Sequence, residues 1–258
     1  MIYQISNLKF SYNQKQPVLN NISLDVNEGE LLCVLGKNGS GKTTLFNCLL
    51  KILKHYEGTI LLNGVDIRKL NEKEIAKSVG YVTQSNDSTF NFTVFEYVLM
   101  GLAINVSIFS SPSRNDEQRV YKVLEEMNIL DLANRPFKEL SGGEKQQAAI
   151  ARAIVKKPQI LIFDEPTAHL DYANQLKVLR MIKDLSLKGY GIVVSTHNPD
   201  HAILLNGKVA LLDGLGNIKI GTSNKLITEK NLKNIYGKEL KIRYIEEFKR
   251  NVCIYPEL

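Results

Sequence analysis

The N-terminal part of the chain alternates apolar and polar positions in the manner of β-strands. Apolar side chains recur with mostly strand-like spacing from Ile5 to Tyr12 and again from Ile22 to Val26. Asn63-Gly64 separates two further apolar stretches, and this dipeptide is a strong hairpin signal. We therefore expect an antiparallel sheet in this part of the chain.

Continuous apolar runs, typical of strands buried on both faces of a parallel sheet, follow at intervals. They are Leu31–Leu35, Val79–Thr83, Gln159–Phe163 and Gly191–Thr196. Between them, Glu72–Ser78 and Tyr172–Leu185 have helical character. The pattern predicts an α/β fold in which helices flank a parallel sheet and an antiparallel β subdomain precedes it.

Strand alternation is absent from about residue 86 to residue 140, and helix signals replace it. Thr93 and Glu96 have the spacing of a capping box, and Asp116-Glu117 stand where a second helix would begin. We expect an α-helical insertion here. Nearer the C-terminus we expect a hairpin over 208–221 and a helix from Leu226 to Ile235 ended by Gly237, and we assign no structure to residues 238–258.

Composition narrows the possible functions only slightly. The net charge of +6 is mild and no block of Lys or Arg appears, so we expect no nucleic-acid partner. The three cysteines are odd in number and lack the spacing of a metal site, so we expect them to be free thiols in a reducing compartment. No apolar run approaches the length of a membrane span, and Met1–Gln4 lacks the basic start of a signal peptide. We expect a cytoplasmic protein.

A glycine-rich segment lies between the first buried run and a helix-like pattern, and it matches the phosphate-loop motif G-x-x-x-x-G-K-[ST]. Backbone N–H groups and the helix dipole would bind phosphate oxygens, Lys42 would reach the β and γ phosphates, and Thr43 would bind Mg²⁺. The alternative is a simple turn before an ordinary helix. The phosphate-binding residues would be Gly36, Asn38, Gly39, Ser40, Gly41, Lys42, Thr43 and Thr44.

Polar residues follow three of the buried runs. Gln84, Asp164-Glu165 and His197 would meet at the carboxyl edge of the sheet, where ligands of such folds bind. Asp164 and Gln84 suit a Mg²⁺ shell, Glu165 suits polarisation of a water, and His197 suits a γ-phosphate contact. The alternatives are a solvated acidic turn and a structural histidine.

Two further features allow more than one interpretation. Ser141-Gly142-Gly143-Glu144 opens a predicted helix, so it is either a helix cap or a cradle for the phosphate of a nucleotide bound to another subunit. Tyr12 stands before a polar turn, where it would either stack on a nucleobase or pack as a strand residue.

These motifs occur in one order that closely resembles the nucleotide-binding subunits of ATP-binding cassette transporters, over roughly Ile2 to Gly221. The resemblance implies a P-loop NTPase core in residues 1–221, with a helical subdomain at about 86–140 and a C-terminal extension at 222–258. It also implies a head-to-tail homodimer that encloses two ATP molecules with Mg²⁺. Thr43, Gln84 and Asp164 would bind the metal.

The resemblance also assigns roles to individual residues. Glu165 would be the general base, assisted by Lys42 and His197, and Tyr12 would stack on adenine. Ser141, Gly142, Gly143 and Glu144 would contact the nucleotide of the partner subunit, and Asp171 would couple the two sites. Glu144 replaces the commoner Gln of this signature. His169 is less usual, and we assign it no role.

Within this family, the segment from Phe90 to Gly101 is similar to that of importers of iron chelates, haem, cobalamin or metal oxyanions. The resemblance implies integral membrane permease subunits as partners, a solute-binding protein acting through the permease, and a position on the inner face of the cell membrane. The alternatives are an ATPase for another cargo or for export, a cassette ATPase that works without a permease, and a small-molecule kinase.

Overall fold

The computed structural model describes residues 1–13, 16–84, 91–105 and 112–256. Its largest sheet has six strands in the order β10-β9-β3-β8-β7-β6, all parallel except β10, which pairs antiparallel with β9. These strands are β3 (Leu31–Leu35), β6 (Val79–Val82), β7 (Ile160–Phe163), β8 (Gly191–Thr196), β9 (Lys208–Leu212) and β10 (Ile218–Thr222). The parallel strands predicted from the four apolar runs are all present.

A second, antiparallel sheet has the order β2-β1-β4-β5 and confirms the predicted N-terminal β subdomain. The expected hairpin turn at Asn63-Gly64 joins its last two strands, and both turn residues have positive φ. The strands are β1 (Tyr3–Phe10), β2 (Leu19–Val26), β4 (Glu57–Leu62) and β5 (Val65–Asp66). A short 3₁₀ turn, η1 (Ile67–Lys69), follows β5.

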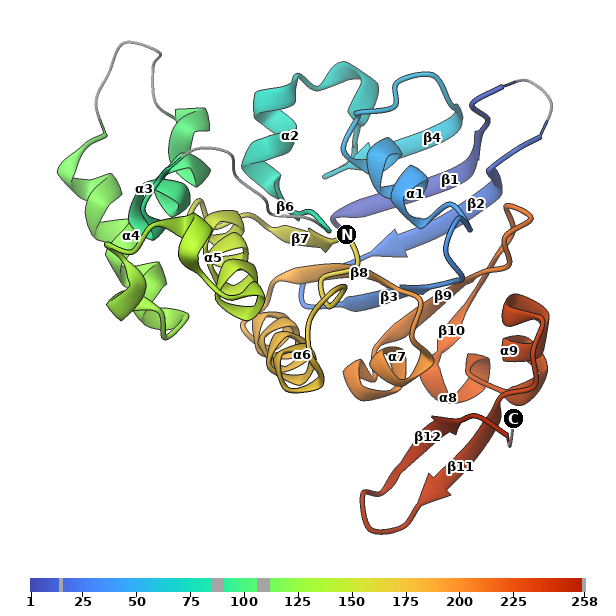
Figure 1. The fold of residues 1–258 in the computed structure, drawn as a ribbon. Helices are drawn as coiled ribbons and strands as arrows, with labels where there is room; N and C mark the ends of the chain where they lie inside the picture. Colours follow the sequence, from blue (N-terminus) through green and yellow to red (C-terminus); the bar gives the residue numbers. More distant parts are fainter. Residues whose placement is uncertain (14–15, 85–90, 106–111, 257–258) are drawn as a thin grey trace.

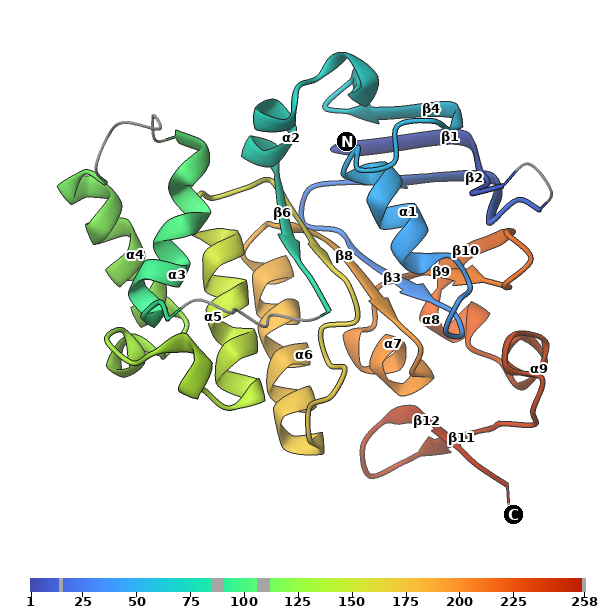
Figure 2. The same ribbon diagram turned by 45° about the horizontal axis from the view of Figure 1, so that its top comes forward.

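Helices cover both faces of the six-stranded sheet (Figures 1 and 2). Side chains of β3 alternate between two hydrophobic cores: Leu32 and Val34 join the core with α1 and the small sheet, and Cys33 joins the core on the opposite face. The helices of the sheet are α1 (Lys42–Leu49), α2 (Glu72–Ser78), α5 (Gly142–Ile154), α6 (Tyr172–Leu187) and α7 (Pro199–Leu205). Because β3 is buried on both faces, the strand end at which the following loop begins is held within the core.

The predicted helical insertion is present in the described part of residues 86–140. The Thr93–Glu96 capping box is confirmed, since Thr93 Oγ1 accepts from Glu96 N at 3.2 Å and Glu96 Oε2 accepts from Thr93 N at 2.8 Å. Tyr97 stacks on Phe137 inside the insertion, with ring centroids 4.0 Å apart. Its helices are α3 (Val94–Leu99), η2 (Met100–Asn105), α4 (Arg114–Glu126), η3 (Leu130–Leu132) and η4 (Phe137–Glu139).

The C-terminal region differs from expectation. The single helix predicted from Leu226 is two helices, α8 (Ser223–Leu226) and α9 (Glu229–Tyr236), because Thr228 caps a new helix start through Asn231 N. Residues that had no predicted structure form a hairpin of β11 (Lys241–Ile245) and β12 (Arg250–Ile254). Within the described ranges we find no helix with the length and apolar character needed to cross a membrane. The division into domain and extension at residue 222 stays a prediction.

A buried histidine at the start of α7 joins the strand ends that carry the site. Thr196 Oγ1 lies 3.2 Å and Thr167 Oγ1 3.3 Å from His201 Nδ1, and Gln175 Oε1 lies 3.3 Å from Nε2. Burial, assisted by the nearby His197, lowers the pKa of His201 to about 4. His201 is therefore neutral at physiological pH and ties β8 to α6 and to the segment after β7.

His201 is expected to make folding stability depend on pH. Its folded-state pKa lies below the ordinary value of about 6.5, so below that pH the unfolded chain binds a proton that the folded chain does not. The stabilising contribution is complete above about pH 6.5 and is lost as the pH falls toward 4, by up to about 3 kcal/mol. Chemical denaturation of the parent and of His201→Gln across this pH range measures the difference.

The exposed His55 supplies a matched control for this experiment. His55→Gln should keep the pH dependence of the parent, whereas His201→Gln should lose part of it. Identical pH dependence in the parent and in His201→Gln would show that His201 binds its proton equally well in both states.

Candidate functional site

The loop between β3 and α1 has the backbone shape that the phosphate-loop motif requires. Gly39 and Gly41 have φ values of 78° and 101°, in the left-handed region that favours glycine. A Cβ on Gly36 would lie only 2.4 Å from Ser40 Oγ, so the loop closes tightly at that residue. The first turn of α1 contains no acidic side chain, and its N–H groups lie at a helix N-terminus suited to anions.

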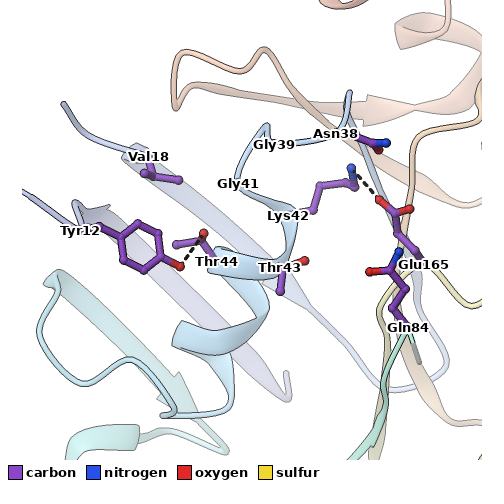
Figure 3. A pocket seen from close by; sticks show the side chains of 10 residues that line it. All are labelled: Tyr12, Val18, Asn38, Gly39, Gly41, Lys42, Thr43, Thr44, Gln84 and Glu165. Carbon is purple, nitrogen blue, oxygen red and sulfur yellow. Dashed lines mark hydrogen bonds and ion pairs between the residues drawn. The ribbon is translucent and has the colours of Figure 1, made fainter. Parts of the chain in front are cut away.

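This loop forms one wall of a pocket of about 510 Å³. Figure 3 shows Tyr12 at one end of the pocket and Gln84 and Glu165 at the other, with Lys42 between them. The lining residues are Tyr12, Val18, Asn38, Gly39, Gly41, Lys42, Thr43, Thr44, Gln84 and Glu165. The fold thus brings together predicted residues from the segment after β1, from the loop before α1 and from the ends of β6 and β7.

The Lys42 ammonium lies at the centre of the site, and its side chain is only 4% exposed. It donates to Gly36 O at 2.9 Å and to Lys37 O at 3.1 Å. Its charge is balanced by Glu165, whose Oε1 lies 3.0 Å away. The cation is therefore held at the pocket by loop carbonyls and one carboxylate.

The Glu165 carboxylate also contacts His197, with Oε2 3.0 Å from Nδ1. Burial alone would raise the pKa of Glu165, but hydrogen bonds and charges from Lys42 and His197 outweigh it and lower this pKa. The Glu165 backbone has a φ of 44°, a left-handed conformation that is unusual for a side-chain-bearing residue. Glu165 is thus ionised at neutral pH and held in a constrained turn.

Ser195 is a site residue that sequence reasoning missed. Its Oγ accepts from Glu165 N at 2.8 Å and donates to Asp164 Oδ1 at 2.7 Å. Asp164 is itself buried. The sequence signal for Ser195 is weak: it is a hydroxyl near the end of a mostly apolar strand, and Thr196 beside it carries another. Val18, which lines the pocket, has no such signal.

The residues present fit a bound phosphate chain and a magnesium ion. Ser40 Oγ, in the loop, is buried and has no hydrogen-bond partner within the described structure. Its hydroxyl is therefore available to bond a ligand held by the loop. Thr43 and Gln84 line the pocket and offer neutral oxygens, whereas the Asp164 carboxylate is buried, accepts from Ser195 Oγ and is not among the lining residues. Because Mg²⁺ takes few protein ligands and fills its shell with water and phosphate oxygens, this modest set suits it.

Tyr12 is 64% exposed, and its hydroxyl lies 3.2 Å from Thr44 Oγ1. The ring also packs edge-on against Phe10, with centroids 4.9 Å apart. Both interpretations of Tyr12 are therefore compatible with its position: it packs on a strand residue, and it leaves a ring face open beside the pocket.

The second glycine motif does not line this pocket. Ser141 caps α5, accepting from Glu144 N at 3.3 Å while Glu144 Oε2 accepts from Ser141 N at 2.8 Å. A Cβ on Gly143 would lie 2.3 Å from Asn174 Oδ1, and Asp171 Oδ1 accepts from Asn174 N at 2.8 Å. The predicted cap is present, and the role toward a partner subunit stays a prediction. Ser141 and Gly142 are exposed at this helix start.

Comparison with known proteins matches residues 19–168 to the ABC transporter family. An ABC transporter ATP-binding protein of uncharacterized function from Methanocaldococcus jannaschii is 39% identical, covering 99% of this chain and 98% of the relative. A molybdate import ATP-binding protein of Haemophilus influenzae is 34% identical, covering 90% and 87%. A metal-chelate type ABC transporter solved in an inward-facing conformation superposes with a TM-score of 0.86 at 31% identity, covering 98% and 96%.

The structural match confirms the predicted P-loop fold class, and the sequence matches extend over nearly the whole chain. They exclude the small-molecule kinase alternative, because the matched family is one of transporter ATPases. The chain belongs to the ABC transporter family as an ATP-binding subunit, and it is an ATPase.

Proposed function

We propose that the chain powers a separate membrane permease by hydrolysing ATP between two of its copies. The observation that carries this proposal is that one chain supplies the phosphate loop, Glu165 and His197, while Ser141 and Gly142 stand exposed outside the pocket. A head-to-tail dimer would bring the α5 helix start of one copy to the γ phosphate of the other. Gly143 and Glu144 would support that contact, and Asp171 would lie where the two sites meet.

In the proposed binding step, Tyr12 stacks on adenine and the loop N–H groups hold the phosphates. Thr43, Gln84 and Asp164 would hold Mg²⁺, which neutralises phosphate charge when bound. Lys42 would exchange its contact with Glu165 for the γ phosphate, since both partners are anionic and the ammonium is nearly buried.

This exchange would prepare Glu165 for catalysis. The lowered pKa of Glu165 means that the residue enters the reaction ionised. Once Lys42 turns to the phosphate, the carboxylate is free to accept a proton from the attacking water. His197, already 3.0 Å from Glu165, would contact the γ phosphate and stabilise its developing charge.

A groove beside the α2–β6 segment suits a permease contact. It has a volume of about 330 Å³ and is lined by α2, β6, η2 and α5. Ile52 and Met100 line it and are 59% and 38% exposed, so they add apolar surface that a partner helix could cover. We propose that a cytoplasmic helix of the permease docks here and places this subunit on the inner face of the membrane.

The proposed cargo is a metal chelate of the iron-siderophore, haem or cobalamin type, taken up through the permease with a solute-binding protein. The metal-chelate type structural neighbour supports this class, and the molybdate relative supports the metal oxyanion alternative. In the segment that suggested the cargo, Tyr97 and Val98 are buried within the insertion and Phe90 lies outside the described residues. That segment therefore bears on the cargo only through the shape of the insertion.

Glu165→Gln should lower ATP hydrolysis by at least about a hundredfold, because the amide cannot accept the proton from water. ATP affinity should remain close to that of the parent, and an ATP-dependent dimer should accumulate in size-exclusion chromatography. Glu125→Gln, which alters an exposed carboxylate on α4, is the matched control. Parental hydrolysis by Glu165→Gln, or a strictly monomeric ATP-loaded form, would overturn the proposal.

Lys42→Ala should weaken nucleotide binding about tenfold to a hundredfold, the effect of losing one charge-assisted contact to phosphate. Isothermal titration calorimetry with ATP at saturating Mg²⁺ measures the change. Lys122→Ala removes an exposed lysine from α4 and should bind as the parent does. Equal affinity of all three proteins would contradict the assignment of the loop.

Met100→Asp should abolish co-purification with the permease while leaving ATP hydrolysis by the isolated subunit unchanged, because it places a charge in the groove. The measurement is detergent extraction of co-expressed subunits followed by affinity capture of this chain. Leu187→Asp, which alters an exposed leucine at the end of α6, is the control. Failure of the parent to retain any membrane subunit would instead favour a cassette ATPase without a permease.

A further inference from the structure

The C-terminal segment packs beside the residues that follow His197. Figures 1 and 2 show α9 and the β11–β12 hairpin beyond α7, at the end of the molecule opposite the helical insertion. Strand β12 contacts α7 directly. The segment is therefore close enough to His197 to act on it.

The segment is firmly attached to the main core. Leu232 and Ile235 of α9, and Leu240 after it, are buried in the same hydrophobic core as Cys33 of β3. Glu229 ties the helix to the hairpin by accepting from Ile242 N at 3.2 Å. Atoms of α9 and β12 thus hold defined positions relative to the sheet.

Two hydrogen bonds reach from this segment to residues 197–200. The Tyr236 hydroxyl donates to His197 O at 2.6 Å, and Cys253 N donates to Asp200 Oδ1 at 2.9 Å. Burial of the Tyr236 ring raises the pKa of its hydroxyl, which therefore remains a donor at physiological pH. The turn between β8 and α7 is held from outside at both of its ends.

His197 needs such external support because its side chain is 51% exposed. Within the described residues its side chain contacts the Glu165 carboxylate, which would lose Lys42 as a partner when nucleotide binds. A side chain with so little packing takes its position from its backbone. We propose that Tyr236 is a positioning residue for His197, and that the C-terminal segment thereby sets the rate of hydrolysis.

This inference rests on the proposed role of His197 in hydrolysis, and the two can be tested separately. His197→Gln tests the role of the histidine itself and should lower kcat strongly. Tyr236→Phe removes only the hydroxyl oxygen, keeps the partly buried ring, and leaves every side chain of the pocket intact. Tyr244→Phe makes the same change on an exposed tyrosine of β11 and serves as the control.

We expect Tyr236→Phe to lower kcat about threefold to tenfold with the KM for ATP unchanged, because one hydrogen bond that orients a catalytic group is lost. Tyr244→Phe should match the parent in both constants. In NMR spectra of isotope-labelled histidine, the His197 imidazole signal, identified by its loss in His197→Gln, should shift in Tyr236→Phe and stay in place in Tyr244→Phe.

Three results would overturn the proposal. The first is a kcat for Tyr236→Phe equal to that of Tyr244→Phe. The second is a lowered kcat with an unmoved His197 signal. The third is a lowered kcat with KM and melting temperature altered in parallel, which would show that Tyr236 supports the fold generally. If His197→Gln itself retained parental kcat, the proposed role of His197 would fail, and the NMR comparison would still decide whether Tyr236 positions it.

Discussion

A buried ammonium group must be matched by negative charge, and this requirement organises the site. Lys42 is held by the carbonyls of Gly36 and Lys37, which satisfy its N–H groups but carry no net charge. Glu165 supplies the missing charge at 3.0 Å. Removing one member of a buried pair leaves the other uncompensated, which costs several kcal/mol. The loop before α1 and the end of β7 are therefore coupled electrostatically.

The same constraint explains how binding and catalysis can be linked. A phosphate chain and Glu165 are alternative partners for one cation, so the arrival of one weakens the hold on the other. The carboxylate that balances Lys42 is also the group proposed to accept a proton from water. His197 keeps contact with this carboxylate from the opposite side. Competition for Lys42 would thus change the environment of the proposed general base once the substrate is in place.

Sequence reasoning succeeded where a local pattern has one structural solution. The apolar runs of β3, β7 and β8 could only be buried strands, and the glycine spacing from Gly36 to Gly41 fixed the loop between β3 and α1. It could not pair Lys42 with Glu165 or find Ser195 between Asp164 and Glu165. Those contacts join segments far apart in the chain, and their geometry depends on the strand order of the folded sheet.

The C-terminal region was missed for a different reason. Strands β11 and β12 are short and only partly buried, and charged residues such as Arg243 and Arg250 interrupt their apolar positions. The pairing energy of such a hairpin comes mostly from tertiary contacts, which a sequence window does not contain. The Thr228 cap likewise divides α8 from α9 where apolar spacing alone suggests one helix.

The contact between Tyr236 of α9 and His197 would give the C-terminal segment a role beyond stability. The residue lies between the Glu165 carboxylate, which would lose Lys42 as a partner in the proposed exchange, and the Tyr236 hydroxyl on a helix anchored in the main core. A histidine held only by Glu165 would follow any shift of that carboxylate. With its carbonyl held by Tyr236, His197 would instead keep its position. The C-terminal segment would then keep His197 in place beside the Glu165 carboxylate. In this way a segment that does not contact the phosphates would influence their hydrolysis.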